Sequence, residues 1–194
     1  MAKKYWVLLG IVVVVTALIA SYLASGHQTP PGQPQLLAIT PESLPQFTQE
    51  FNRSANVERV VLLMSPTCPV CLEGSSAVQA ILRDHPGDDI RVFAVWEPML
   101  PTDWGRPNTH VLRRLSDPRV VQVWDKGHLI ARSIENGAAG RRPACCSRNG
   151  AWWDVLAAYP PGSKWDGTAP TPELLNGTIV RTAPRLKAQL SQPS

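Results

Sequence analysis

The stretch VVLLMSPTCPVCLEGSSAVQAIL, residues 60–82, decides the fold. An aliphatic run meets a Ser-Pro-Thr turn, two cysteines then bracket a Pro-Val pair, and apolar residues at helical spacing follow. The run over residues 57–64 is typical of a strand buried on both faces. The sequence therefore predicts a strand, a sharp turn that carries Cys68 and Cys71, and a helix that begins at the first cysteine.

The remaining elements complete an α/β domain with a mixed sheet. Residues 90–96 form a second apolar strand, and a strand, helix and strand joined this closely predict a parallel βαβ unit. A helix over 43–55, with Ser43 at its N-cap, precedes that unit. We expect a helix over 108–115, a strand over 119–124, a helix or an antiparallel strand over 125–137, a strand over 152–159, a return strand over 176–182 and a closing helix over 183–190. The helix is favoured over 125–137 because strict alternation is absent there. A βαβ half followed by a ββα half results.

The N-terminus predicts membrane attachment. Residues 5–25 carry no charge, and their length is about what a helix needs to cross a bilayer core. Lysines at 3 and 4 make residues 1–4 a cytoplasmic tail and place the rest of the chain outside, in the periplasm or the cell exterior. A cleaved signal peptide is the alternative, with Ala24–Gly26 as the cleavage site. In either case the cysteines face a space that permits disulfides.

The rest of the chain divides into a linker and one domain. Residues 26–41 are rich in proline and predict a semi-rigid spacer that holds the domain away from the membrane. Residues 42–191 form the domain, which is long enough to bury about two-thirds of its unfolded surface. The net charge is +4 and no long basic run is present, so the sequence gives no support to nucleic-acid binding.

The position of the CPVC motif indicates redox chemistry. Cys68 falls where a buried parallel strand ends and a helix begins, and the free amides and dipole of that helix stabilise a thiolate. Pro69 suits the first helical turn, and Cys71 lies one turn later on the same face. We therefore expect an exposed Cys68 of lowered pKa that attacks and a more buried Cys71 that resolves. A structural disulfide and half of a metal site are the alternatives.

The string SPTCPVC and its flanking strand and helix, over residues 57–85, resemble the thioredoxin superfamily. The local motif looks most like the membrane-anchored thioredoxin-like proteins of the TlpA kind, including the methylamine-utilisation disulfide-handling protein. The resemblance implies disulfide exchange with extracytoplasmic protein thiols and disulfides, with Cys68 attacking and Cys71 resolving. It also implies that no bound cofactor is required and that a membrane redox partner regenerates the pair.

Three positions depart from the thioredoxin pattern. Thr67 stands where a tryptophan commonly precedes the first cysteine, and Leu62 stands where thioredoxins place a buried acid. The cis-proline that faces the active site has only Pro118 as a candidate, and only if the strand over 119–124 begins an antiparallel hairpin. Proton handling and substrate range are therefore expected to differ from those of thioredoxins.

A second cysteine pair, Cys145 and Cys146, lies in a loop rich in glycine and arginine. Nearby arginines favour thiolates. If the strand over 152–159 pairs antiparallel with the central strand, this loop lies on the Cys68 edge of the sheet. The pair then exchanges disulfides with CPVC or joins it in binding a soft metal ion such as Cu(I). The alternative is two structural or unpartnered thiols.

Other candidate residues follow the second parallel strand. The carboxyl ends of parallel strands meet at one edge, which brings Trp96, Glu97 and Trp104 to the Cys68 edge. Glu97 is a candidate for proton transfer to Cys71, with a solvated loop carboxylate as the alternative. Trp96 and Trp104, together with the Pro-Val pair at 69 and 70, are candidates for a substrate surface. The four histidines show no metal-ligand spacing, and no metal site is assigned.

The sequence thus predicts a membrane-anchored, extracytoplasmic thiol-disulfide oxidoreductase with a thioredoxin-like fold. Two other classes of function stay open. One is a protein that binds or delivers a soft metal through CPVC and the vicinal cysteine pair. The other is a thioredoxin-like binding module without catalysis.

Overall fold

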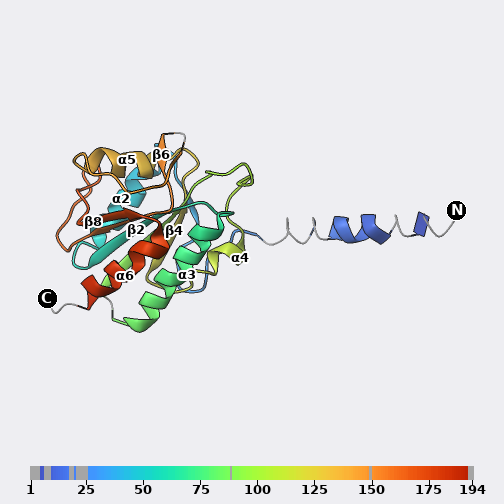
Figure 1. Ribbon diagram of the computed structural model, residues 1–194, viewed down its shortest axis with the longest axis horizontal. Coiled ribbons are helices and arrows are strands. Elements are labelled where there is room, and N and C mark those ends of the chain that lie inside the picture. Colours follow the sequence, from blue (N-terminus) through green and yellow to red (C-terminus); the bar gives the residue numbers. More distant parts are fainter. Residues whose placement is uncertain are drawn as a thin grey trace.

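The computed structural model describes residues 5–6, 10–17, 20, 26–87, 89–148 and 150–191. Figure 1 shows the elements of this part of the chain. In chain order they are β1 (Leu37–Ala38), α2 (Leu44–Arg53), β2 (Glu58–Met64), α3 (Pro69–Asp84), β3 (Ile90–Trp96), α4 (Thr109–Leu112), β4 (Val120–Trp124), α5 (Leu129–Gly137), β5 (Ser147–Arg148), β6 (Ala151–Trp152), β7 (Val155–Tyr159), β8 (Leu174–Gly177) and α6 (Ile179–Leu190).

A six-stranded mixed sheet runs through the centre in the order β1-β4-β3-β2-β7-β8. Strands β1, β4, β3 and β2 are parallel, whereas β7 and β8 are antiparallel to their neighbours. Leu62 on β2 is paired with Ala94 on one side and with Leu156 on the other. The βαβ unit and the ββα unit that follows therefore meet at β2, which confirms the predicted thioredoxin-like α/β fold.

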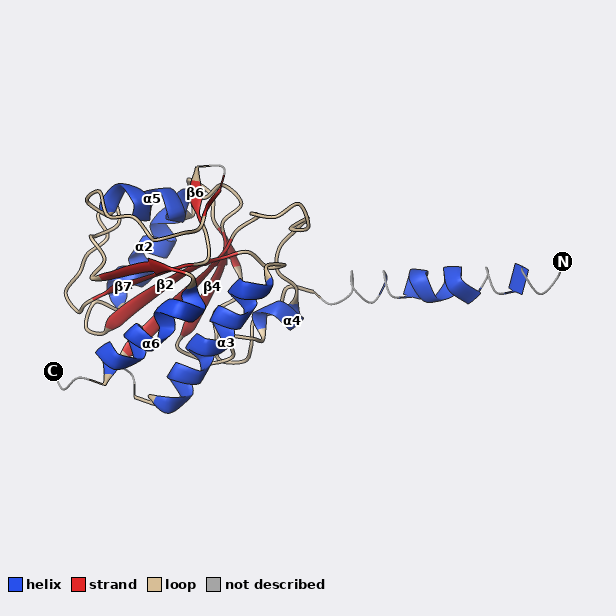
Figure 2. Ribbon diagram, in the orientation of Figure 1, coloured by secondary structure: helices blue, strands red, loops and turns tan. Residues whose placement is uncertain are grey.

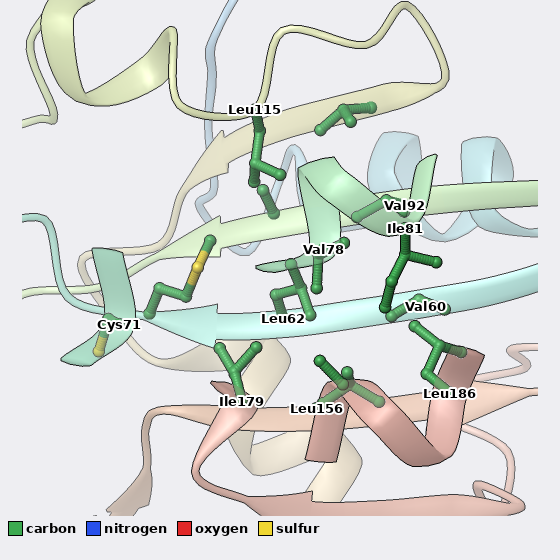
Figure 3. Packing of buried hydrophobic residues seen from close by; sticks show 14 of the residues in the cluster. Val60, Leu62, Cys71, Val78, Ile81, Val92, Leu115, Leu156, Ile179 and Leu186 are labelled. Carbon is green, nitrogen blue, oxygen red and sulfur yellow. The ribbon is translucent and has the colours of Figure 1, made fainter. Parts of the chain in front are cut away.

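Helices cover both faces of the sheet (Figure 2). Helices α3 and α6 pack together on one face, and α2 and α5 lie on the other. Successive residues of β2 alternate between the two cores: Leu62 packs with the α3 side, and Leu63 packs with Phe47 and Phe51 of α2. Figure 3 shows the first of these cores, with Leu62 between the two helices. From Val60 to Met64 every residue of β2 is apolar, as expected of a strand whose two faces are both buried.

Most predicted elements are present with small changes. The segment over 125–137 contains a helix, as favoured, and the helix over 108–115 shortens to the single turn of α4. Ser43 occupies the N-cap of α2, but its hydroxyl donates to the carbonyl of Ala38 instead of capping a helix amide. The predicted strand over 152–159 is divided into β6 and β7. The division falls at Asp154, which has a left-handed backbone with φ +51°.

The return strand predicted over 176–182 is wrong in its bounds. Strand β8 ends at Gly177, and α6 begins at Ile179, so most of the expected strand is the first turn of a helix. Ile179, Ala183 and Leu186 recur at helical spacing and are buried in the core beside α3. This apolar stripe accounts for the helix, which accommodates Pro184 in its interior.

Residues 26–41 do not form a spacer separate from the domain, as their prolines had led us to expect. Strand β1 extends the sheet beside β4, and the Gln33 side-chain amide donates to the carbonyls of Leu115 and Asp117, each at 2.7 Å. Ile39 is buried in the core on the α2 side. The apolar residues that follow the prolines fasten this segment to the domain, so the folded unit begins before residue 42.

The transmembrane anchor predicted over residues 5–25 lies in large part outside the described residues. Within the described part of the chain, no helix combines the length and the apolar character that crossing a membrane requires.

Candidate active site

Cys68 caps the N-terminus of α3. Its backbone is extended, with φ −81° and ψ 114°, and its sulfur accepts a hydrogen bond from the amide of Cys71 at 3.3 Å. Pro69 is the first residue of the helix, where the missing N–H has no partner to lose. The strand-turn-helix order thus places a sulfur where the unpaired amides and positive end of a helix meet.

The two thiols of the motif are set apart in acidity. A hydrogen bond from the Cys71 side chain, helped by the amides of Cys71 and Val70, lowers the pKa of Cys68 to about 7 against the opposing effect of burial. The same bond to Cys68 and the surrounding apolar core raise the pKa of Cys71 well above its ordinary value. The geometry therefore stabilises a thiolate on Cys68 and a proton on Cys71.

Cys68 is less accessible than expected from the sequence. It is 4% exposed and Cys71 is fully buried, so the expectation of an exposed Cys68 is wrong. The helix cap draws the sulfur under the turn, while Thr67, Pro69 and Val70 around it stay exposed. These three residues are therefore the exposed surface nearest to Cys68 in the sequence.

The turn before Cys68 is fastened by one buried carboxylate, Asp103. One of its oxygens, Oδ2, accepts from the Ser65 hydroxyl at 2.7 Å and from two amides of its own loop, Met99 and Leu100. The other, Oδ1, accepts from the amide of Thr67 at 3.1 Å and from its hydroxyl at 2.7 Å. Five donors thus converge on Asp103 and join the loop after β3 to the Ser-Pro-Thr turn.

Trp104 follows Asp103 directly and projects from the same loop. This side chain is 87% exposed, and its indole N–H donates to the carbonyl of Pro101 at 2.7 Å. Val70, 40% exposed, lies in the first turn of α3, directly after the segment that Asp103 ties to the same loop. Both residues are available for a substrate surface. Trp96 is not, because it is fully buried and its indole N–H donates to Gln122 in the core.

Glu97 is paired with a histidine. It follows β3, it is fully buried, and its Oε2 is bonded to Nδ1 of His128. Burial raises the pKa of Glu97 to about 7, partly offset by the His128 bond, and that bond raises the pKa of His128. The charges that act on Glu97 come from Asp125, His128 and Arg132. This environment does not support its predicted role in proton transfer to Cys71.

Asp154 is the carboxylate that faces the two thiols. It is buried and directly precedes β7, whose Val155 pairs with Leu63 of the central strand. Its Oδ1 accepts from the amide of Ile179 at 3.1 Å, and burial raises its pKa. Its negative charge acts on both Cys68 and Cys71. Asp154 is thus the carboxylate whose charge reaches both thiols of CPVC.

Pro118 does not supply a proline beside the motif. It precedes β4, which is parallel to β3, so it lies at the edge of the sheet away from Cys68. The residue before the strand that pairs antiparallel with β2 is Asp154. In the described part of the chain the cis peptide bond joins Gly177 and Thr178.

The second pair is oxidised: Cys145 and Cys146 are bonded to each other, while Cys68 and Cys71 are free. Cys145 is exposed and Cys146 is half-buried against the core on the α5 side. In the described residues, no three His, Cys, Asp or Glu side chains are placed to hold a metal ion.

Comparison with known proteins finds similarity at the level of structure. The chain is similar to the thioredoxin domain of a thiol-disulfide oxidoreductase from Bacteroides vulgatus, at 12% identity and TM-score 0.39, over 70% of this chain and 82% of that one. It is also similar to a thioredoxin-like protein from Aeropyrum pernix, at 13% identity and TM-score 0.36, over 75% and 98% of the two chains. No protein-family model and no curated protein matches the sequence.

Sequence reasoning missed two of the residues that shape the site. Asp103 belongs to no recognisable sequence motif. Its position in the loop after the second parallel strand, six residues after Glu97, nevertheless placed it at the correct edge of the sheet. Asp154 directly precedes a predicted antiparallel strand, and that placement could have indicated it. Both signals depend on knowing which strands are neighbours.

Proposed function

We propose that the protein is a thiol-disulfide oxidoreductase of the membrane-anchored TlpA-like kind. The thiolate of Cys68 attacks a sulfur of a substrate disulfide, forms a mixed disulfide and releases one substrate thiolate. Cys71 then loses its proton and attacks Cys68, which releases the second substrate thiolate and leaves a Cys68–Cys71 disulfide. Two electrons pass to the substrate, and the reverse sequence oxidises a substrate dithiol.

One observation carries this proposal: the sulfur of Cys68 caps a helix and has a pKa of about 7. A thiol of this acidity is about half ionised at pH 7, far more than an ordinary cysteine, and also leaves readily in the second step. Ordinary buried cysteines are inert because the apolar surroundings favour the protonated form. The pairing of an acidic Cys68 with a protonated Cys71 suits exchange better than it suits a structural bridge.

Asp154 is suited to accept the proton of Cys71 during resolution. Its buried carboxylate acts on both thiols, and burial raises its pKa toward the range in which it can exchange protons. Asp154 would thus supply the buried carboxylate for proton transfer that position 62, a leucine, does not provide. This role makes the second step depend on Asp154 more than the first.

We further propose that residues 5–25 anchor the domain to the membrane with its redox site outside the cytoplasm. Lys3 and Lys4 precede this uncharged segment. The Cys145–Cys146 disulfide suits an oxidising compartment. Its partners there are protein thiols and disulfides, and a membrane redox protein that restores the CPVC pair.

The test uses the full-length protein in detergent with insulin as the disulfide substrate. Cys68→Ser is expected to lower insulin turnover at least about 100-fold, because the attacking thiolate is lost. Cys71→Ser is expected to accumulate a mixed disulfide with insulin through Cys68, since the resolving thiol is missing. The double variant Cys145→Ser/Cys146→Ser keeps CPVC and serves as the matched control, with turnover retained. Unchanged turnover in Cys68→Ser would contradict the proposal.

A further inference from the structure

The vicinal disulfide directly precedes a short hairpin whose first strand is exposed. Strands β5 and β6 form this hairpin, and it packs against α5 at one margin of the sheet (Figure 2). The carbonyl of Cys146 accepts from the amide of Trp153 at 3.0 Å. That bond fixes the disulfide next to the segment that leads into Asp154.

Gly177 connects the surroundings of the two cysteine pairs. A Cβ placed on Gly177 would lie 3.0 Å from Sγ of Cys145, 3.1 Å from Sγ of Cys146 and 3.0 Å from the carbonyl oxygen of Asp154. Both sulfurs of the disulfide and the carbonyl of Asp154 therefore pack closely against the backbone of Gly177. The carboxylate of the same Asp154 acts on Cys68 and Cys71.

The last link runs through the start of α6. Ile179 donates its amide to Asp154, and its side chain lies against Gly74 of α3. Gly74 is one helical turn beyond Cys71, and both lie in the core on the α3 side. A continuous set of contacts thus leads from the vicinal disulfide through Gly177, Asp154 and Ile179 to the CPVC helix.

We propose that Cys145–Cys146 is a second redox centre that takes electrons from the reduced CPVC pair. The thiolate of Cys68 attacks Sγ of Cys145, the Cys145–Cys146 bond breaks, and Cys146 leaves as a thiolate that takes up a proton. Cys71 loses its proton and attacks Cys68, which breaks the Cys68–Cys145 bond and releases Cys145. Two electrons and one proton, that of Cys71, have then moved to the vicinal pair. CPVC is a disulfide, Cys146 is a thiol and Cys145 is a thiolate.

Access and charge decide this order of steps. Cys145 is exposed whereas Cys146 is half-buried, so Cys145 is the sulfur that an incoming thiolate can reach. Arg142 and Arg148, both exposed on the same loop, favour the thiolates produced when the bond opens. Direct exchange requires the sulfurs to touch, so the hairpin must move over Asp154 to deliver Cys145. A reduced vicinal pair then offers its electrons to a second partner at the molecular surface.

This inference rests on the proposed function, and a trapping experiment separates the two. In full-length Cys71→Ser/Cys146→Ser protein, only Cys68 and Cys145 remain. Under mild oxidation with glutathione disulfide, we expect an internal Cys68–Cys145 bond in most molecules, identified by mass spectrometry of tryptic peptides. The matched variant Cys71→Ser/Cys145→Ser leaves Cys68 and Cys146, and its internal bond is expected at less than about a tenth of that level, because Cys146 is shielded.

A second measurement keeps all four cysteines. Oxidised wild-type protein receives one equivalent of a phosphine reductant, and samples are acid-quenched and alkylated over time. The alkyl group marks the cysteines that are reduced at each time. We expect the reduced thiols to redistribute between the two pairs until their ratio is constant, and we expect Cys68→Ser to abolish this redistribution. Glutathione adducts without an internal bond, or a label that stays where it began in wild type, would overturn the inference. Insulin turnover by Cys145→Ser/Cys146→Ser shows separately whether CPVC itself exchanges disulfides.

Discussion

The two cysteine pairs of this protein differ in how firmly the fold holds them. Cys68 and Cys71 are buried at a helix N-terminus, and five donors to Asp103 fasten the turn that leads to them. Cys145 and Cys146 directly precede a short two-stranded hairpin, and Cys145 is exposed. The fixed surroundings of CPVC allow the fold to set the pKa of each thiol. The exposed position of Cys145 allows its sulfur to contact other sulfur atoms.

The contrast also concerns the environment of charge. Hydrogen bonds from Cys71 and from helix amides lower the pKa of Cys68, whereas the negative charge of Asp154 raises it. The vicinal pair has arginines nearby in sequence and the backbone of Gly177 beneath it. In our account, one pair is built for controlled acidity and the other for access. Changes to the scaffold of CPVC should therefore cost more than changes to the vicinal pair.

The largest effect is expected from Asp103→Ala. This change leaves buried donors of Ser65, Thr67 and the 99–100 amides without their acceptor, and each such loss is costly. We expect the free energy of unfolding to fall by about 3 kcal/mol, measured by urea denaturation. Glu73→Ala, an exposed position on α3, is the control, with a change within about 0.5 kcal/mol. Equal effects of the two variants would show that Asp103 does not fasten the turn.

Gly177→Ala tests the contact between the two regions. The added methyl group meets both sulfurs of the vicinal disulfide and the carbonyl of Asp154 within 3.1 Å, so the hairpin must shift. We expect the free energy of unfolding to fall by about 2 kcal/mol and tryptic cleavage between Arg141 and Arg148 to accelerate. Gly105→Ala, where an added Cβ meets nothing within 4 Å, should change neither. Unaltered cleavage in Gly177→Ala would contradict the placement of the hairpin.

Glu97→Gln probes the buried pair outside both redox regions. The folded protein holds a proton on Glu97 with a pKa of about 7, above its ordinary 4.5, and the pKa of His128 is also raised. The folded state thus binds protons more tightly than the unfolded chain. Stability that is fully present below about pH 4.5 is therefore lost as pH rises through about 7. Asp125, His128 and Arg132 are the charged groups that act on Glu97.

The measurement is urea unfolding of wild type and Glu97→Gln between pH 5 and 8. Wild type should lose on the order of 2 kcal/mol across this range from Glu97, and Glu97→Gln should lose distinctly less. Insulin turnover should be the same in both, since Glu97 is paired with His128. A flat wild-type profile, or turnover lost in Glu97→Gln, would return Glu97 to the role that the sequence indicated.

The smallest effect on stability is expected from Cys145→Ser/Cys146→Ser. A disulfide between neighbouring residues closes almost no loop and so restricts the unfolded chain very little. Its loss should lower the free energy of unfolding by no more than about 1 kcal/mol. Cys71→Ser, which places a hydroxyl at a fully buried position, should lose more. A larger loss in the vicinal variant than in Cys71→Ser would make that disulfide structural.

The fold was predictable from the sequence where burial leaves an unambiguous pattern. The apolar runs of β2 and β3 and the CPVC turn between them determine the βαβ unit, because a strand buried on both faces admits few alternatives. The start of α6 was misassigned because Ile179 and Val180 also suit a strand, and only packing against Gly74 selects the helix. The proline-rich start was misassigned because its anchoring depends on distant carbonyls that accept from Gln33.

The site was predictable in its sulfurs and less so in its carboxylates. Cys68 and Cys71 follow from local sequence alone, since a helix N-terminus is a local feature. Glu97, Asp103 and Asp154 all lie near one edge of the sheet, and local sequence does not tell which of them faces the thiols. The pairing of β7 with β2 brings Asp154 near Cys68. Glu97 instead bonds to His128, whose backbone is left-handed. These assignments depend on contacts between residues 30 to 90 positions apart.

The fold lowers the pKa of Cys68 to about 7, which makes it the reactive thiol of the protein. The direct test is the rate of alkylation of Cys68 by iodoacetamide as a function of pH, in reduced Cys145→Ser/Cys146→Ser protein. We predict a rate that rises with a midpoint near pH 7, while Cys71 stays unlabelled throughout. A midpoint near pH 8.5, the value of an ordinary cysteine, or equal labelling of the two thiols, would contradict the account.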